Sequence, residues 1–197
     1  MQIQPPVINI FEKAVRKAGR SVVRDFGEIE NLQIHSKKLA DFVTTADIKT
    51  EKILLEVLQY YYPNASYITE ESDPIKGNEE IIVIDPIDGT TNFIHGIPIF
   101  SIVIAKIVKN DVVDGVIFNP ITNEFFWASK GAGAWCNNNR LRVSKRQNFI
   151  ECVIGTGIPH FGRSYEGYLD EIHQISKECS GLRRMGSAAL DLAYVAA

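Results

Sequence analysis

The sequence predicts an α/β protein in which helices and sheets pack in layers. Apolar residues recur at three- and four-residue steps in the first third of the chain, which is typical of amphipathic helices. After residue 65, runs rich in β-branched and aromatic residues are separated by turn signals, which is typical of strands. The 197 residues are 45% hydrophobic and 23% charged, as in ordinary globular proteins.

Two helices are expected before residue 65. Pro5 and Pro6 precede apolar positions that continue with helical spacing over residues 7–26. A second helix is predicted to begin near Asp47, as its N-cap, and to end before Pro63, because proline cannot continue a helix.

The middle of the chain is expected to form an antiparallel or mixed sheet. Residues 109–111 and 120–123 are typical of hairpin turns, and successive hairpins argue against strict β-α-β alternation. The stretch 130–139, KGAGAWCNNN, is predicted to be a loop. The expected strands lie at 67–69, 81–84, 99–108, 112–118, 124–129 and 140–143.

A second unit is predicted to begin near residue 146. We therefore expect an N-terminal α+β domain over residues 1–145 and the start of a C-terminal α/β domain over 146–197. The final helix has neither a C-cap glycine nor a proline behind it, so we expect a truncated domain. The elements expected here are a strand at 152–155, a helix at 165–177, a short strand at 180–184 and a helix that opens at Gly186 and Ser187.

Composition argues against several classes of protein. The net charge of -3 disfavours a general nucleic-acid-binding surface. No apolar run approaches the roughly 18 residues of a membrane span, and the N-terminus does not resemble a signal peptide. The three cysteines contain no C-x-x-C pair, which disfavours a disulfide framework or a zinc site. We expect a cytoplasmic protein.

The segment DPIDGTTNF, residues 85–93, carries the strongest chemical signal. A simple turn would explain its Asp-Pro and Asp-Gly dipeptides. The same turn would also direct Asp85, Asp88 and the Ile87 carbonyl towards one point, and oxygen ligands of this kind suit Mg²⁺. Gly89 permits a close backbone approach, and a short helix opening at Thr90 would offer N–H groups to an anion.

Several segments, in order, resemble the inositol monophosphatase family of Mg²⁺-dependent, lithium-sensitive phosphatases. The central match is DPIDGTTNFIHGIP at 85–98. The others are DFVTTADIKTE at 41–51, ITEES at 68–72, the stretch 115–144, and RRMGSAALDLAYVAA at 183–197. The resemblance implies a layered αβαβα sandwich of the inositol monophosphatase and fructose-1,6-bisphosphatase type, with its second sheet domain incomplete here.

The resemblance also implies the metal ligands. Glu70, Asp85 and the Ile87 carbonyl would bind a first Mg²⁺, and Glu70 would be catalytic because this metal holds the attacking water. Asp85 and Asp88 would contribute to a second metal. Read alone, Glu70 would be a solvated surface acid.

The remaining roles implied by the resemblance concern water and substrate. Asp47 and Thr90 would form a hydrogen-bonded catalytic pair that orients or activates the water. The N–H groups of Gly89 and Thr90 would bind the phosphate. The residues expected to approach the hydroxyl-bearing part of the substrate are Gly186, Ser187 and Ala188.

The expected function is therefore Mg²⁺-dependent hydrolysis of a small phosphate monoester, with inositol 1-phosphate as the leading substrate and a homodimer as the expected assembly. The alternatives are a related sugar or nucleotide phosphatase, or an inactive truncated enzyme that acts as an interaction protein. A haloacid-dehalogenase phosphatase is disfavoured because two residues, not one, separate Asp85 from Asp88.

The resemblance departs at the C-terminal end. The family's W-D-x-A segment, whose aspartate completes the second metal site, is not among these 197 residues, and Asp191 is expected to lie in the wrong place to substitute. We therefore expect the 197 residues to bind the first metal and to show little hydrolysis.

Overall fold

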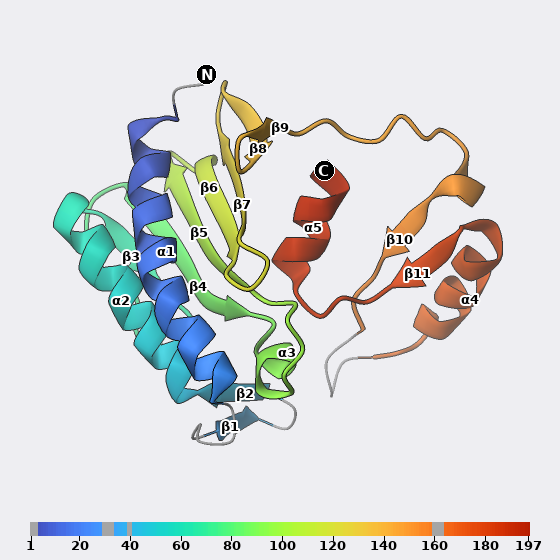
Figure 1. The fold of residues 1–197 in the computed structure, drawn as a ribbon, viewed down its shortest axis with the longest axis horizontal. Coiled ribbons are helices and arrows are strands. Elements are labelled where there is room, and N and C mark those ends of the chain that lie inside the picture. Colours follow the sequence, from blue (N-terminus) through green and yellow to red (C-terminus); the bar gives the residue numbers. More distant parts are fainter. Residues whose placement is uncertain (1–3, 29–33, 39–40, 159–163) are drawn as a thin grey trace.

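The structure, a computed structural model, describes residues 4–28, 34–38, 41–158 and 164–197. These ranges form an α/β fold with a mixed seven-stranded sheet and five α-helices (Figure 1). The helices are α1 (Pro6–Gly27), α2 (Thr45–Tyr61), α3 (Thr90–Ile94), α4 (Tyr168–Glu178) and α5 (Ala188–Ala196). The strands are β1 (Ile34–Lys38), β2 (Asp41–Thr44), β3 (Ser66–Ile68), β4 (Glu80–Asp88), β5 (Ser101–Val108), β6 (Asp111–Asn119), β7 (Glu124–Ser129), β8 (Gly133–Cys136), β9 (Asn139–Arg140), β10 (Val153–Gly155) and β11 (Gly181–Arg183).

Helices α1 and α2 pack together over one face of the large sheet (Figure 1). The apolar stripe of α1 is fully buried, as its helical periodicity predicts. Lys49 of α2 donates hydrogen bonds to both carboxylate oxygens of Asp25 on α1, at 3.0 and 2.9 Å. The buried stripe of α1 comprises Ile8, Phe11, Ala14, Val15, Ala18 and Val22.

The N-cap of α2 corrects the sequence prediction. Thr44, not Asp47, is the N-cap, because its extended backbone lets its hydroxyl accept from the N–H groups of Ala46 and Asp47. Asp47 occupies the third helical position, and its carboxylate accepts from the Thr44 N–H. The two residues thus form a capping box.

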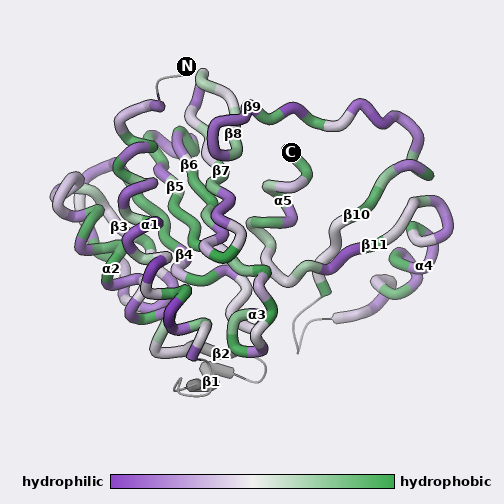
Figure 2. The backbone as a smooth tube through the Cα atoms, viewed as in Figure 1, coloured by the Kyte–Doolittle hydropathy of each residue, from purple (hydrophilic) through white to green (hydrophobic). Residues whose placement is uncertain are grey.

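The large sheet has the strand order β3-β4-β5-β6-β7-β8-β9. Strand β3 runs parallel to β4, and the other neighbours are antiparallel, which confirms the predicted mixed sheet. Both predicted hairpin turns are present, with left-handed backbone at Lys109, Asn110 and Asn123. Figure 2 shows that hydrophobic residues follow the central strands beneath the helices.

The prediction for residues 130–143 is wrong in part. The expected loop contains β8, which pairs with β7, whereas the strand expected at 140–143 retains only Arg140, in β9. Trp135 of β8 stacks on its cross-strand partner Trp127, with ring centroids 5.6 Å apart. This pairing outweighs the weak strand propensity of the glycines around it.

The C-terminal elements appear in the predicted order. Strands β10 and β11 pair in parallel, α4 connects them, and the three elements lie away from the large sheet (Figure 1). Helix α5 returns to the face opposite α1 and α2, where Leu190 and Ala193 pack near Phe126. The domain boundary at residues 145 and 146 stays a prediction. In the described residues, no helix is long and apolar enough to cross a membrane.

Gly19 lets α1 approach β6, which predicts a position-specific loss of stability. A Cβ atom at Gly19 would lie 2.8 Å from the Phe118 ring, whereas one at Gly27 would meet nothing within 4 Å. We expect Gly19→Val to lower the free energy of unfolding by about 1–3 kcal/mol through overpacking. Urea denaturation would measure this loss. The matched control, Gly27→Val, should change stability far less, and equal losses would contradict the packing argument.

Candidate active site

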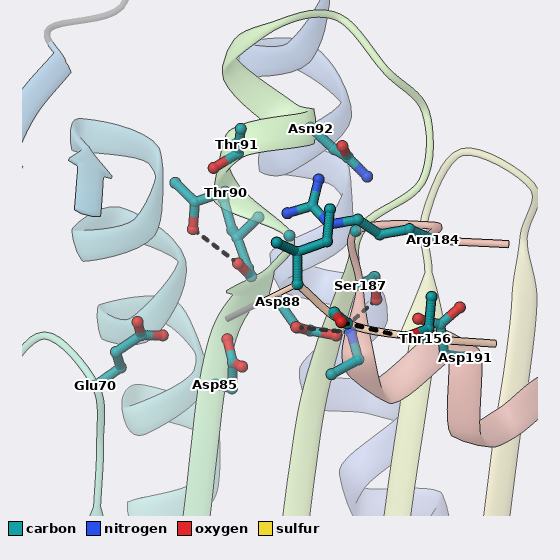
Figure 3. Close-up of a pocket in the computed structure, with 16 residues that line it drawn as sticks. Glu70, Asp85, Asp88, Thr90, Thr91, Asn92, Thr156, Arg184, Ser187 and Asp191 are labelled. Atoms are coloured by element: carbon teal, nitrogen blue, oxygen red, sulfur yellow. Dashed lines mark hydrogen bonds between the residues drawn. The ribbon is translucent and has the colours of Figure 1, made fainter. Parts of the chain in front are cut away.

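A pocket of ≈ 380 Å³ lies where the end of β4, the start of α3, the loop after β3 and the start of α5 meet (Figure 3). It gathers nine of the ten site residues predicted from the sequence. The tenth, Asp47, is buried behind the lining and contacts it through Thr90. The nine are Glu70, Asp85, Ile87, Asp88, Gly89, Thr90, Gly186, Ser187 and Ala188.

An extra residue in β4 explains how two of the acids reach the same pocket. Asp85 pairs with Val103 of β5, and Asp88 pairs with Ser101, so three steps along β4 oppose two steps along β5. In a regular strand, residues three apart point to opposite faces. The extra residue, in a segment where Pro86 has no N–H to donate, brings both carboxylates to one side.

Asp85 is the most strongly perturbed acid of the pocket. Burial, followed by the charges of Glu70 and Asp88 and a hydrogen bond with Glu70, raises the pKa of Asp85 to about 8. Its Oδ1 atom is buried and has no hydrogen-bond partner. A buried carboxylate oxygen without a donor is costly, and a cation beside it would reverse the direction of the shift.

The donor set fits a hard divalent cation. The charges of Glu70 and Asp88 act on Asp85, whose Oδ1 atom has no partner, and carboxylate oxygens are the ligands that Mg²⁺ takes. The Ile87 carbonyl, the fourth predicted ligand, accepts a hydrogen bond from Thr90 Oγ1 at 3.0 Å. Within the described part of the chain, no three His, Cys, Asp or Glu side chains already form a compact metal centre. Glu70, Asp85 and Asp88 therefore line the same pocket without forming a compact set of metal ligands in this structure.

Asp47 and Thr90 are brought together as predicted. Asp47 is 1% exposed, and its Oδ2 accepts from the Thr44 N–H at 2.9 Å and from the Thr44 hydroxyl at 2.6 Å. Its Oδ1 faces the Thr90 hydroxyl at 3.3 Å. Burial raises the pKa of Asp47, and the hydrogen bonds from Thr44 and Thr90 oppose that rise. The start of α2 thus fixes the buried Asp47 carboxylate next to Thr90, which lines the pocket.

Two glycines let the segments before α3 and α5 meet. Gly89 has a left-handed backbone, and a Cβ atom on it would lie 3.1 Å from the Gly186 carbonyl oxygen. Gly186 is also left-handed, and its Cβ would lie 2.6 Å from Asn92 Nδ2. That buried amide donates to the Ile99 and Met185 carbonyls, both at 2.7 Å, and so ties the two segments together.

Asp88 caps the N-terminus of α5. Its carboxylate accepts from the Ser187 hydroxyl at 2.6 Å, the Ala189 N–H at 2.8 Å and the Ala188 N–H at 3.3 Å. Ser187 is fully buried, and its oxygen also accepts from the Leu190 N–H. The Ser187 hydroxyl is therefore committed to the helix cap, and the Ser187 carbonyl accepts from the Asp191 N–H at 3.0 Å.

Sequence reasoning missed several residues of the pocket lining. Asp191, expected to lie out of place, lines the pocket from the first turn of α5, and its pKa is raised by burial and then by the charge of Asp88. Asp191 follows Ser187 by four residues, which places both on one face of the helix. This spacing was the sequence signal that could have placed Asp191 in the pocket. The other lining residues outside the prediction are Thr91, Asn92, Thr156, Gly157, Ile158 and Arg184.

The raised pKa of Asp85 predicts a pH-dependent stability. Without a cation, the folded state holds a proton on Asp85 up to pH about 8, whereas an ordinary aspartate loses its proton near pH 3.8. The stability that this protonation supports is complete below pH 3.8 and is lost as the pH rises through about 8. Melting in EDTA across this range should therefore show falling stability, and Mg²⁺ should reverse the loss.

The variant Asp85→Asn is the control for this prediction. It carries no titrating group at the position, so its stability should fall less steeply with pH in EDTA and should respond less to Mg²⁺. A wild-type slope in the variant would show that Asp85 is not the group responsible.

The chain is similar to proteins named inositol-1-monophosphatase and to proteins named SuhB. The inositol-1-monophosphatase of Rhizobium meliloti strain 1021 is 48% identical over 194 residues, which cover 97% of this chain and 73% of the relative. The Nus factor SuhB of Pasteurella multocida is 42% identical over 195 residues, covering 98% and 73% of the two chains. The crystal structure of the extragenic suppressor protein SuhB from Bartonella henselae matches with a TM-score of 0.94 at 47% identity, over 97% and 74% of the chains.

The match extends through the whole described fold. A model of the inositol monophosphatase family covers residues 4–197, which include both the acids at the end of β4 and the helix α5 that closes the pocket. The protein therefore belongs to the inositol monophosphatase family.

Proposed function

We propose that this member of a phosphatase family is a Mg²⁺-dependent hydrolase of inositol 1-phosphate or a chemically similar phosphate monoester. The observation that carries the proposal is the buried, unpaired Asp85 oxygen beside Glu70 and Asp88. Such a group needs a cation, and a cation beside a polar pocket suits a dianionic ester. The similarity to the Rhizobium inositol-1-monophosphatase supports the choice of substrate.

We assign a first cation to Glu70, Asp85 and the Ile87 carbonyl, and a second cation to Asp85 and Asp88. Bound Mg²⁺ supplies positive charge for the phosphate and lowers the pKa of a coordinated water. The protein's part is to keep the carboxylates on one side of β4 and to limit the access of solvent to them.

Asp47 and Thr90 are assigned to the attacking water. When Thr90 Oγ1 donates to Asp47 Oδ1, its lone pairs remain free to accept a hydrogen bond from water. A buried aspartate with a raised pKa is suited to taking up a proton that passes through this hydroxyl. The capping bonds from Thr44 hold the carboxylate in the orientation that this role requires.

The substrate contacts are assigned to two backbone segments. The N–H groups of Gly89 and Thr90 would bind the phosphate, since the left-handed Gly89 opens the chain at this point. The backbone from Gly186 to Ala188, which lines the same pocket, would face the alcohol part of the ester.

Further properties rest on the resemblance. These proposed properties are a homodimer and sensitivity to lithium. Composition supports two others: a cytoplasmic location, and the absence of general nucleic-acid binding, which fits the net charge of -3. A related sugar or nucleotide phosphatase remains the alternative substrate class. A second role, as an interaction protein, is supported by the similarity to a relative named Nus factor SuhB.

The test combines cation binding with ester binding and hydrolysis. Titration calorimetry should detect Mg²⁺ binding, and inositol 1-phosphate should bind only when Mg²⁺ is present. Asp85→Asn should weaken Mg²⁺ binding by about 100-fold or more, because it removes a charged ligand from a low-dielectric site. Fructose 1,6-bisphosphate, histidinol phosphate and a nucleotide 3′-phosphate, assayed in parallel, identify the preferred ester.

The control is Asp111→Asn, the same substitution at an exposed acid paired with Lys130. It should bind Mg²⁺ and ester as the unmodified protein does. A protein that binds neither Mg²⁺ nor any of the esters would overturn the proposed function. Binding of both with little hydrolysis is the result expected if these 197 residues bind only the first metal, and it is also compatible with the interaction protein.

A further inference from the structure

We propose that Glu51 is a positioning residue that holds the loop bearing Glu70 at the pocket, a role that rests on the proposed cation site. Glu51 lies on α2 and is 1% exposed, whereas glutamate side chains are almost never fully buried unless they are paired. It lies one helical turn after Asp47 and does not line the pocket itself.

Both oxygens of the Glu51 carboxylate accept hydrogen bonds from the loop 69–72. Oε2 accepts from the Glu71 N–H at 2.8 Å, and Oε1 accepts from the Ser72 hydroxyl. The loop has neither helical nor strand structure, and a hydrogen bond within it joins Thr69 Oγ1 to the Ser72 carbonyl at 3.0 Å. Glu51 thus connects helix α2 to this loop at two points.

The hydrogen bond from the Glu71 N–H to Glu51 determines the backbone orientation at Glu70. The Glu71 N–H belongs to the peptide unit that directly follows the Glu70 α-carbon, and this unit is planar. A bond to it from a buried carboxylate sets the backbone direction at Glu70. The Glu70 side chain can then reach Asp85, with which it shares a hydrogen bond.

The chemistry of Glu51 favours this role over simple packing. A buried carboxylate carries a desolvation cost that an apolar residue of similar size would avoid. The advantage of the charge is that both oxygens accept hydrogen bonds, which suits a loop that offers one N–H and one O–H. Glutamine would present an NH₂ group to one of these donors.

The consequence is that one rigid helix sets two parts of the site. The first turn of α2 carries Asp47, which faces Thr90, and the next turn carries Glu51, which holds the Glu70 loop. Helical residues four apart lie on the same face at a set distance. The spacing between the proposed water-orienting pair and a proposed cation ligand is thus built into α2.

The experiment measures Mg²⁺ affinity by calorimetry for the full 197-residue chain, Glu51→Gln, Glu70→Gln and the double variant. We expect Glu51→Gln to weaken binding by about 10- to 100-fold, as is typical for residues that orient metal ligands. If Glu51 acts through Glu70, adding Glu51→Gln to Glu70→Gln should change the affinity by less than about 3-fold. A purely structural residue would give the same loss in both backgrounds.

Two controls separate positioning from unfolding. Glu56→Gln makes the same substitution on α2, at a side chain that is 55% exposed, and should leave the affinity unchanged. Ser72→Ala removes one donor from an exposed residue and should weaken Mg²⁺ binding in the same direction as Glu51→Gln. In EDTA, hydrogen exchange at the Glu71 amide should accelerate in Glu51→Gln, while the melting temperature reports the fold.

The outcomes are distinct. Normal Mg²⁺ affinity and a protected Glu71 amide in Glu51→Gln would overturn the inference and leave the proposed function intact. An equal loss of affinity with and without Glu70 would also overturn it. Failure of the unmodified protein to bind Mg²⁺ would overturn the proposed function, and the Glu71 exchange rate would still decide whether Glu51 holds the loop.

Discussion

The extra residue that β4 carries between Asp85 and Asp88 is the constraint on which the rest of the site depends. It turns both carboxylates to the same side of the strand, where burial and like charges make the ionised form of Asp85 costly without a cation. The chain then passes directly through the left-handed Gly89 into α3. Residues 85–90 thus contain two acids, the backbone N–H groups of Gly89 and Thr90, and the Thr90 hydroxyl. A small change in the backbone of this segment would move all of these groups together.

Asp88 links this segment to the C-terminal part of the chain. A carboxylate at a helix N-terminus is stabilised by the free N–H groups and the helix dipole, and α5 supplies both to Asp88. The residues joined are about 100 positions apart in the sequence. The proposed second cation would draw on the same negative charge of Asp88 as the start of α5, so its binding would be energetically linked to the docking of α5.

Much of the fold was predictable because its signals are local. The buried stripe of α1, the hairpin turns and the alternation of elements after residue 150 follow from spacing, turn residues and propensity. The errors arose where a specific side-chain pair, not the general propensity of the segment, decided the structure. Strand β8 forms in a glycine-rich stretch because Trp135 stacks on Trp127, and the cap of α2 moved to Thr44 because a capping box satisfies more donors than Asp47 alone.

The sequence by itself determined which residues we propose for the chemistry, because the acids, the glycine and the threonines of DPIDGTTNF are adjacent and their types suit a cation and a phosphate. The tertiary structure decided how they are held. It placed Asp191 in the pocket, committed the Ser187 hydroxyl to Asp88 and brought Glu51 to the loop of Glu70. The two hydrogen-bonded contacts join residues 99 and 20 positions apart. Local periodicity cannot specify them, because only the packing of α2, β4 and α5 around one pocket brings the partners together.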